Sequence, residues 1–195
     1  LLPMEGTNGS TTFTDVSKDA RTVTVVGNVQ ISTAQAKWGT SSAVYDGDGD
    51  RLTGTLASAV GTSDFFMEAW VYIVSRPAGT ALINIGDDAY ASGFVLYSTA
   101  AGRIAIYSAT QINVVGTTQT IPTGSWCHVS VSKSGTTIRL FVNGVLDGSG
   151  THNASLLASF ALGVTLENGA YGPSFNGYIG EARITVGQSR YTATF

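Results

Sequence analysis

Residues 126–148, WCHVSVSKSGTTIRLFVNGVLDG, contain the pattern that decides the fold. Residues 127–132 alternate small apolar side chains (Cys, Val, Val) with polar ones, which predicts a strand with one buried face. A second alternating segment, 138–142, follows a Ser-Gly turn. Asn143-Gly144 then tolerates the positive φ values of a type I′ hairpin turn. We therefore predict three consecutive antiparallel strands.

Similar segments recur along the chain at a spacing of roughly ten residues, separated by Gly, Asp and Ser turns, as in sandwiches and barrels. β-Branched and aromatic enrichment favours a strand over a buried helix at 64–74. The predicted strands are two within 22–32, around Gly27-Asn28, and one each at 43–46, 51–56, 64–74, 81–85, 93–97, 103–107, 160–165 and 178–186. The predicted fold is an all-β, two-sheet antiparallel β-sandwich.

Composition limits the domain count and the compartment. The 195 residues contain no linker-like tract, so we expect one domain over residues 1–195, and a start without Met is compatible with a fragment of a longer chain. Hydrophobic residues make up 43% and charged residues only 12%, a balance that suits an extracellular or particle-bound protein. The single cysteine, Cys127, alternates with valines and is expected to be a buried apolar side chain.

Charge and hydropathy exclude two classes of partner. The net charge is −3 and the isoelectric point is near 5.2, without a Lys/Arg cluster, so we expect no nucleic-acid binding. No apolar run approaches the ~20 residues that span a bilayer, so we expect no membrane insertion.

Trp126-x-His128-Val129, the Ser-Gly turn and the segment LFVNGV (140–145) together resemble the laminin-G-like, concanavalin-A-like sandwich family. The resemblance extends through residues 5–10, 43–50, 66–71 and 177–184. It implies a jelly roll with one concave sheet, where relatives bind sugars, proteins or calcium.

The segment Asp46-Gly47-Asp48-Gly49-Asp50 is a candidate calcium loop, because three carboxylates supply the oxygen ligands that Ca²⁺ prefers. The alternative is a solvated hairpin loop in which Asp and Gly provide turn geometry. The resemblance implies a structural calcium between the N-terminal strand, this loop and the last strand. The candidate ligands are Glu5, Asp46, Asp48 and Glu181, although the family's aspartate on the last strand is replaced by Gly180.

Four tyrosines, Tyr90, Tyr97, Tyr107 and Tyr171, are candidate ligand-binding residues. Aromatic rings of this kind stack on pyranose faces while polar neighbours bind hydroxyl groups. The alternative is that these rings fill the interior or the edges of the sandwich.

We expect no enzymatic activity. Sandwich glycosidases carry a Glu-x-Asp-x-x-Glu strand, because retaining hydrolysis needs two carboxylates about 5 Å apart on one face, and this motif is absent. Glu68 lies opposite Met67 in the alternation, which favours a position on the solvent face. His128 and His152 lack partners at metal-binding spacing, so we expect no zinc and a structural role for His128.

The sequence at 5–10, the Asp-Gly-Asp-Gly-Asp-x-Leu stretch and the ending RYTATF (190–195) resemble laminin-G-like modules of phage virion and bacterial surface proteins. The leading hypothesis is a binding or structural module of a virion, such as a tail fibre, tail-associated or capsid-decorating part, that contacts glycans or neighbouring subunits. The alternative is a carbohydrate-binding or adhesion domain of a secreted bacterial surface protein or glycoside hydrolase. The expected location is therefore a virion, the cell surface or the extracellular space, and homo-oligomers are compatible with either setting.

Overall fold

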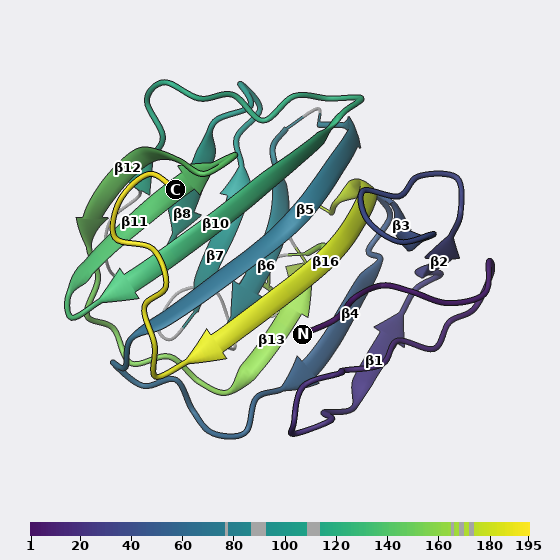
Figure 1. Ribbon diagram of the computed structural model, residues 1–195, viewed down its shortest axis with the longest axis horizontal. Helices are drawn as coiled ribbons and strands as arrows, with labels where there is room; N and C mark the ends of the chain where they lie inside the picture. Colours follow the sequence, from purple (N-terminus) through teal and green to yellow (C-terminus); the bar gives the residue numbers. More distant parts are fainter. Residues whose placement is uncertain (77, 87–92, 109–113, 165, 168–169, 172–173) are drawn as a thin grey trace.

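The computed structural model of the chain describes residues 1–76, 78–86, 93–108, 114–164, 166–167, 170–171 and 174–195 (Figure 1). The described strands form two seven-stranded sheets and one two-stranded sheet, and every ladder between them is antiparallel. The described part of the chain includes no helix with the length and apolarity needed to cross a membrane. The predicted two-sheet antiparallel sandwich is confirmed.

The β5 sheet lies in the foreground of Figure 1, with the long strand β5 at its centre. Its order is β12 (Val145–Thr151), β11 (Thr137–Val142), β10 (Trp126–Ser134), β5 (Phe65–Ser75), β16 (Asn176–Val186), β3 (Ser42–Asp46) and β2 (Gln30–Ser32).

The β6 sheet packs behind it. Its order is β1 (Val23–Val26), β4 (Arg51–Thr55), β13 (Ser159–Leu162), β6 (Thr80–Ile85), β7 (Phe94–Ser98), β8 (Ile104–Tyr107) and β9 (Val114–Val115). The two-stranded sheet joins β14 (Leu166–Glu167) and β15 (Ala170–Tyr171).

The core lies between the two large sheets and follows the alternation of each strand. Cys127, Val129 and Val131 of β10 are fully buried, as predicted. Phe65 of β5 packs edge to face against Phe94 of β7 at 5.2 Å, which joins the sheets. Each fully buried aliphatic or aromatic side chain contributes roughly 1.5–3 kcal/mol of hydrophobic stabilisation.

The β11–β12 hairpin has the predicted turn, because Asn143 and Gly144 have φ values of 49° and 80°. Two other short connections are not hairpins. Gly27-Asn28 joins β1 to β2, and residues 47–50 join β3 to β4, and in both cases the two strands belong to different sheets. The alternative of a hairpin loop at 46–50 is therefore wrong, because this segment carries the chain from one sheet to the other.

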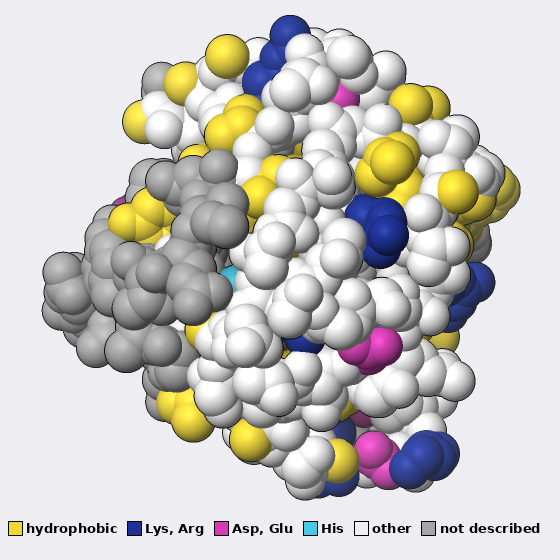
Figure 2. Space-filling view, turned by 90° about the vertical axis from the view of Figure 1, so that its left-hand side faces the viewer, with side chains coloured by type: hydrophobic (Ala, Val, Ile, Leu, Met, Phe, Trp, Pro, Cys, Tyr) yellow, Lys and Arg dark blue, Asp and Glu magenta, His cyan; other side chains and the backbone are white. Residues whose placement is uncertain are grey.

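Figure 2 shows one side of the molecule, where the backbone and uncharged polar side chains (white) predominate and Lys, Arg, Asp and Glu side chains are few. No large basic surface is visible on this side. This distribution agrees with the low charged fraction of the sequence.

Candidate functional site

The outer face of the β5 sheet carries a row of aromatic side chains that crosses three strands. The register places Trp126 of β10 beside Tyr72 of β5, and Tyr72 beside Tyr178 of β16. The Tyr72 ring centroid lies 5.7 Å from that of Trp126 and 5.8 Å from that of Tyr178. All three side chains are half-buried. Cross-strand contacts of this kind stabilise the sheet and still leave aromatic surface accessible.

Trp70 and His128 form the next row, with ring centroids 5.2 Å apart. On β16 this row meets a bulge at 179–182 that contains Gly180. A Cβ atom on Gly180 would lie 3.4 Å from Trp70 and from the Trp126 ring. The Gly180 backbone therefore packs closely against the Trp126 ring and the Cβ atom of Trp70.

The loop between β2 and β3, residues 33–41, reaches this row and is called the Trp38 loop. Lys37 Nζ lies 4.3 Å from the Trp70 ring centroid, a cation–π contact. The Trp38 ring lies 6.1 Å from that of Trp70 in a T-shaped arrangement. Trp38 is 60% exposed, which is unusual for so large an apolar side chain and favours a binding role.

Glu5 holds the Trp38 loop in place. Its carboxylate accepts hydrogen bonds from the Thr40 backbone N–H at 3.1 Å, the Thr40 hydroxyl at 2.9 Å and the Ser41 hydroxyl at 3.3 Å. Gly39 has a φ of +64°, and a Cβ atom there would collide with the Glu5 carboxylate. Glycine at this position thus permits both the backbone turn and the clamp.

Glu68 lies in the third row, between Ser130 of β10 and Arg183 of β16. Its carboxylate accepts a hydrogen bond from the Tyr191 hydroxyl at 3.0 Å and lies 3.4 Å from His128 Nε2 and from Arg183 Nε. Glu68 is on the outer face, as predicted, but it is only 8% exposed because these groups surround it.

Burial alone raises the pKa of the Glu68 carboxyl, but the contacts with His128 and Tyr191 lower it. The balance holds the pKa below its ordinary value of 4.5. The carboxylate is therefore ionised at neutral pH and acts as a hydrogen-bond acceptor.

Residues 187–195 form a strap across the outer face, visible in Figure 1 where the end of the chain crosses β10 and β11. Ser132 Oγ accepts hydrogen bonds from the backbone N–H groups of Arg190 at 3.0 Å and Tyr191 at 3.1 Å. The Phe195 N–H donates to the Gly144 carbonyl at 3.0 Å. The strap is thus attached at both of its ends.

Aromatic contacts also hold the strap. Tyr191 and Phe195 stack with ring centroids 3.6 Å apart, and both rings pack against Phe141 of β11. The Phe195 ring also lies 6.2 Å from that of His128.

Between the strap and the second row lies a pocket of about 170 Å³. It is lined by Glu68, Trp70, His128, Glu181, Arg183 and Tyr191. Aromatic faces beside paired hydrogen-bond donors and acceptors are suited to a small polar ligand with alternating apolar and hydroxylated surfaces. We call the three rows, the Trp38 loop and this pocket the ladder face.

A sequence profile of the concanavalin A-like lectin/glucanase superfamily matches residues 46–186, which include β5, β10 and β16. The chain belongs to this superfamily. The family resemblance inferred from the sequence is therefore confirmed, and the ladder face lies largely within the part of the chain that the superfamily profile matches. No curated protein sequence matches the chain.

Solved structures of similar fold include domain 4 of an extracellular arabinanase from Geobacillus stearothermophilus in complex with arabinotriose. It has a TM-score of 0.63 and 24% identity, over 85% of this chain and 81% of that one. The CBM40 domain of Ruminococcus gnavus IT-sialidase, bound to α2,3-sialyllactose, has a TM-score of 0.59 and 14% identity, over 75% and 92% of the two chains. The botulinum neurotoxin serotype D binding domain has a TM-score of 0.64 and 16% identity, over 91% and 46%. At these identities the likeness establishes the fold.

Two of the four tyrosines predicted to bind ligand, Tyr97 and Tyr107, lie away from the ladder face. Tyr97 and Tyr107 are half-buried on β7 and β8 of the other sheet, with ring centroids 6.4 Å apart. Tyr90 lies outside the described residues, and Tyr171 is described only as part of the backbone of β15. The ligand role of the four tyrosines stays a prediction.

The predicted calcium ligands do not converge in the described part of the chain, where no group of three or more His, Cys, Asp or Glu side chains could hold a metal. Glu5 contacts Ser41 just before β3, whereas Asp46 ends β3, roughly 16 Å along the strand. Asp46 accepts a hydrogen bond from Asn28 Nδ2 at 2.8 Å, and Glu181 pairs with Arg183 at 3.5 Å. The side chains present thus do not fit one calcium ion, and calcium binding stays a prediction.

The loop 46–50 is organised by Asp50, which is 1% exposed. Its carboxylate accepts hydrogen bonds from the Asn28 N–H at 2.7 Å and the Asp46 N–H at 3.1 Å. Asp50 therefore ties together the two connections that carry the chain between the sheets. Asp48 is exposed.

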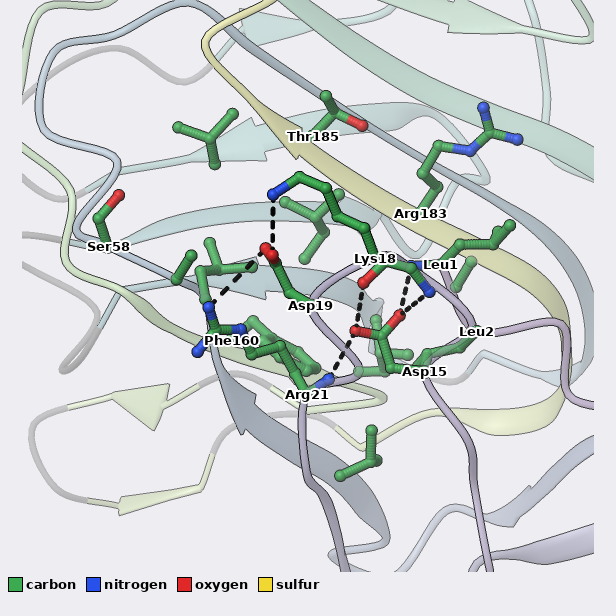
Figure 3. A pocket seen from close by; sticks show the side chains of 18 of the residues that line it. Leu1, Leu2, Asp15, Lys18, Asp19, Arg21, Ser58, Phe160, Arg183 and Thr185 are labelled. Atoms are coloured by element: carbon green, nitrogen blue, oxygen red, sulfur yellow. Dashed lines mark hydrogen bonds and ion pairs between the residues drawn. The ribbon is translucent and has the colours of Figure 1, made fainter.

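A larger cavity, of about 440 Å³, lies between the N-terminal segment and β16 (Figure 3). Figure 3 shows that its charged groups pair with one another: Asp19 contacts Lys18 at 2.8 Å and Arg21 at 3.7 Å. The ladder face is the better candidate site because Trp70, Tyr191 and several polar side chains line one pocket there, next to the exposed Trp38.

Five aromatic residues of the ladder face were not among the binding residues predicted from the sequence: Trp38, Trp70, Tyr72, Trp126 and Tyr178. The alternation that placed Met67 inward also places residues 66, 68, 70 and 72 outward, so this signal was present in the sequence. What the sequence did not show is which strands lie side by side.

Proposed function

We propose that the chain is a non-catalytic glycan-binding module whose binding site is the ladder face. The observation that carries this proposal is the junction of exposed and half-buried aromatic rings with a pocket of paired polar groups. Trp38, the more exposed ring, would stack on the apolar face of a sugar ring, and Trp70, whose ring is nearly perpendicular to that of Trp38, would contact the edge of the sugar. Glu68 would accept hydrogen bonds from hydroxyl groups, and Arg183 would donate them.

The absence of catalysis is part of the proposal. The pocket does contain two carboxylates, Glu68 and Glu181, which contact the same guanidinium of Arg183. Glycoside hydrolysis needs one carboxyl group that is protonated at the working pH, which requires a raised pKa. The pKa of Glu68 is instead lowered. This favours binding over bond cleavage.

Two solved structures of similar fold support a binding role. One was solved with arabinotriose and another with sialyllactose, and both are domains of larger enzymes. A module appended to a secreted bacterial protein is consistent with these likenesses. A virion part, such as a tail fibre, is the other setting, since the sequence at 5–10, 46–52 and 190–195 resembles modules of phage virion proteins as well as of bacterial surface proteins. Genes adjacent to the coding sequence would distinguish the two settings, and both place the module outside the cell.

The test is a glycan array with the purified chain, repeated with calcium and with EDTA. We expect saturable binding that EDTA does not remove, because the ladder face contains no calcium ligand set. Trp38→Ala should weaken binding roughly two- to tenfold, the contribution expected of one aromatic contact. Tyr97→Ala, on the other sheet, is the matched control and should bind as the wild type does. Equal losses in both variants, or binding abolished only by Tyr97→Ala, would refute the assignment.

A further inference from the structure

We propose that the ladder face recognises the end of a neutral glycan chain and does not accept an internal stretch of it. This inference rests on the proposed glycan-binding function. The argument concerns the shape of the site, which has one open end and one closed end.

The open end is the row formed by Trp126, Tyr72 and Tyr178. The next outward position on β5 is Val74, which is 52% exposed. Along the strand direction a bound chain can therefore leave the site past this row. The half-buried rings offer it an apolar track.

The closed end is the strap. Ser132 binds the backbone N–H groups of Arg190 and Tyr191, so the strap lies directly on the fourth row of the face. The guanidinium of Arg190 lies 5.5 Å from the ring centroid of Phe66, the β5 residue of that row. A chain that entered along the aromatic track would meet the strap beyond Glu68.

The sides of the site are also bounded. The Trp38 loop lies at one side, with Lys37 Nζ 4.3 Å from the Trp70 ring centroid. Phe195 lies at the other side, against Phe141 and 6.2 Å from His128. These contacts leave the aromatic row as the accessible exit.

The polar groups gather at the closed end. Tyr191 and Glu68 are hydrogen-bonded there, and Glu68 is nearly buried. Arg183 Nε is buried and has no hydrogen-bond partner among the described residues, although it lies within ion-pair distance of Glu68. A terminal sugar residue presents a free hydroxyl group where an internal residue has a glycosidic bond, so these groups match a chain end.

The charge of the pocket selects the class of sugar. Its lining carries two carboxylates, Glu68 and Glu181, against one guanidinium, Arg183, and the Lys37 ammonium lies over the Trp70 ring without being part of the lining. A carboxylate of an acidic sugar placed in this pocket would face both Glu68 and Glu181 and would be repelled by them. A neutral terminal residue avoids this cost.

The experiment uses the full chain and four neutral series: arabino-, xylo-, cello- and malto-oligosaccharides of increasing length, with the matching soluble polysaccharides. Calorimetric titration gives the number of protein molecules bound per glycan chain. We expect one per chain at every length in the series that binds. Partial hydrolysis of the matching polysaccharide increases the number of chain ends without changing the mass of polysaccharide. The amount of protein bound per mass of polysaccharide should therefore rise in proportion to the number of chain ends.

Two results would overturn the inference alone. One is a stoichiometry that grows with chain length together with a capacity indifferent to hydrolysis, because internal segments would then be bound. The other is a preference for chains that end in an acidic sugar over their neutral counterparts. If neither neutral nor acid-terminated chains bind, the proposed glycan-binding function fails together with the inference. This result differs from the two above, in which a glycan binds but only the inference about chain ends and charge fails.

Discussion

At the scale of single residues, two departures from the family pattern have physical explanations in this chain. Glu5, predicted as a calcium ligand, clamps the loop that presents Trp38. Gly180, where the family resemblance implies an aspartate, packs against the Trp126 ring and the Cβ atom of Trp70. Neither role could be derived from the sequence, because each depends on a contact with a residue that is distant along the chain.

The clamp predicts a specific effect of Gly39→Ala. The new methyl group would collide with the Glu5 carboxylate, so the Trp38 loop should shift and glycan affinity should fall. Gly61→Ala is the matched control, because Gly61 also has a positive φ, +57°, but nothing lies within 4 Å of its added Cβ. Both variants should lose about 1 kcal/mol of stability from backbone strain. Calorimetric titration with the best array glycan tests this, and equal glycan affinity in the two variants would contradict the role of the clamp.

The buried side chain of His152 should make the stability of the protein depend on pH below neutrality. It is 1% exposed, and burial together with the charge of Lys133 lowers its pKa from 6.5 to about 4. The unfolded chain therefore binds a proton below pH 6.5 that the folded chain takes up only near pH 4. The free energy of unfolding should therefore decrease as the pH is lowered from 6.5 to 4, by an amount on the order of 3 kcal/mol.

Urea unfolding of the wild type and of His152→Gln between pH 7 and 4 measures this contribution. The variant should lack most of the decrease between pH 6.5 and 4, even if its stability at pH 7 is lower. A decrease of the same size in both proteins would show that His152 is not its source.

At the scale of elements, local alternation was sufficient to predict the strands but not their partners. The segment 64–74 was predicted correctly as a long central strand, because its inward and outward positions follow period two. The connections at 27–28 and 46–50 were expected to form simple turns. Each of them joins two strands that belong to different sheets. The local sequence of a short turn does not show whether the strands that it connects pair with each other or lie in different sheets.

Asp50 provides a test at this scale. Its carboxylate accepts N–H groups from both connections, so Asp50→Asn would replace one acceptor oxygen by an amide donor. We expect a loss of about 1–3 kcal/mol in the free energy of unfolding. Asp48→Asn, two residues away and exposed, should change it by less than about 0.5 kcal/mol. Urea denaturation in EDTA and in calcium checks both variants. A calcium-dependent loss in Asp48→Asn would instead support the predicted calcium loop.

At the scale of the whole molecule, the β5 sheet is closed at both edges by segments of the same chain. Ile31 of β2 exchanges backbone hydrogen bonds with Gly9 and Ser10. On β12, the Asp147 carbonyl accepts the Thr117 N–H, and the Leu146 N–H donates to Thr194 Oγ1. These contacts protect part of each edge against pairing with a strand of another chain.

The candidate site also belongs to this scale. Its rows combine residues 38, 70, 126 and 178, and its closed end is the strap. The sequence predicted the strands that carry these side chains, but the final residues show no alternation that would place them on a sheet. A site assembled from five segments becomes visible only when the order and register of the strands are known.

The most direct test of the account is the position of a bound glycan in a crystal structure of the complex. We predict a sugar residue against Trp38 and Trp70, with its polar groups directed to Glu68 and Arg183 and with Tyr191 closing the pocket behind it. The rest of the chain should leave across Tyr72. A glycan bound instead over Tyr97 and Tyr107 on the β6 sheet, or in the cavity beside Asp19, would contradict it.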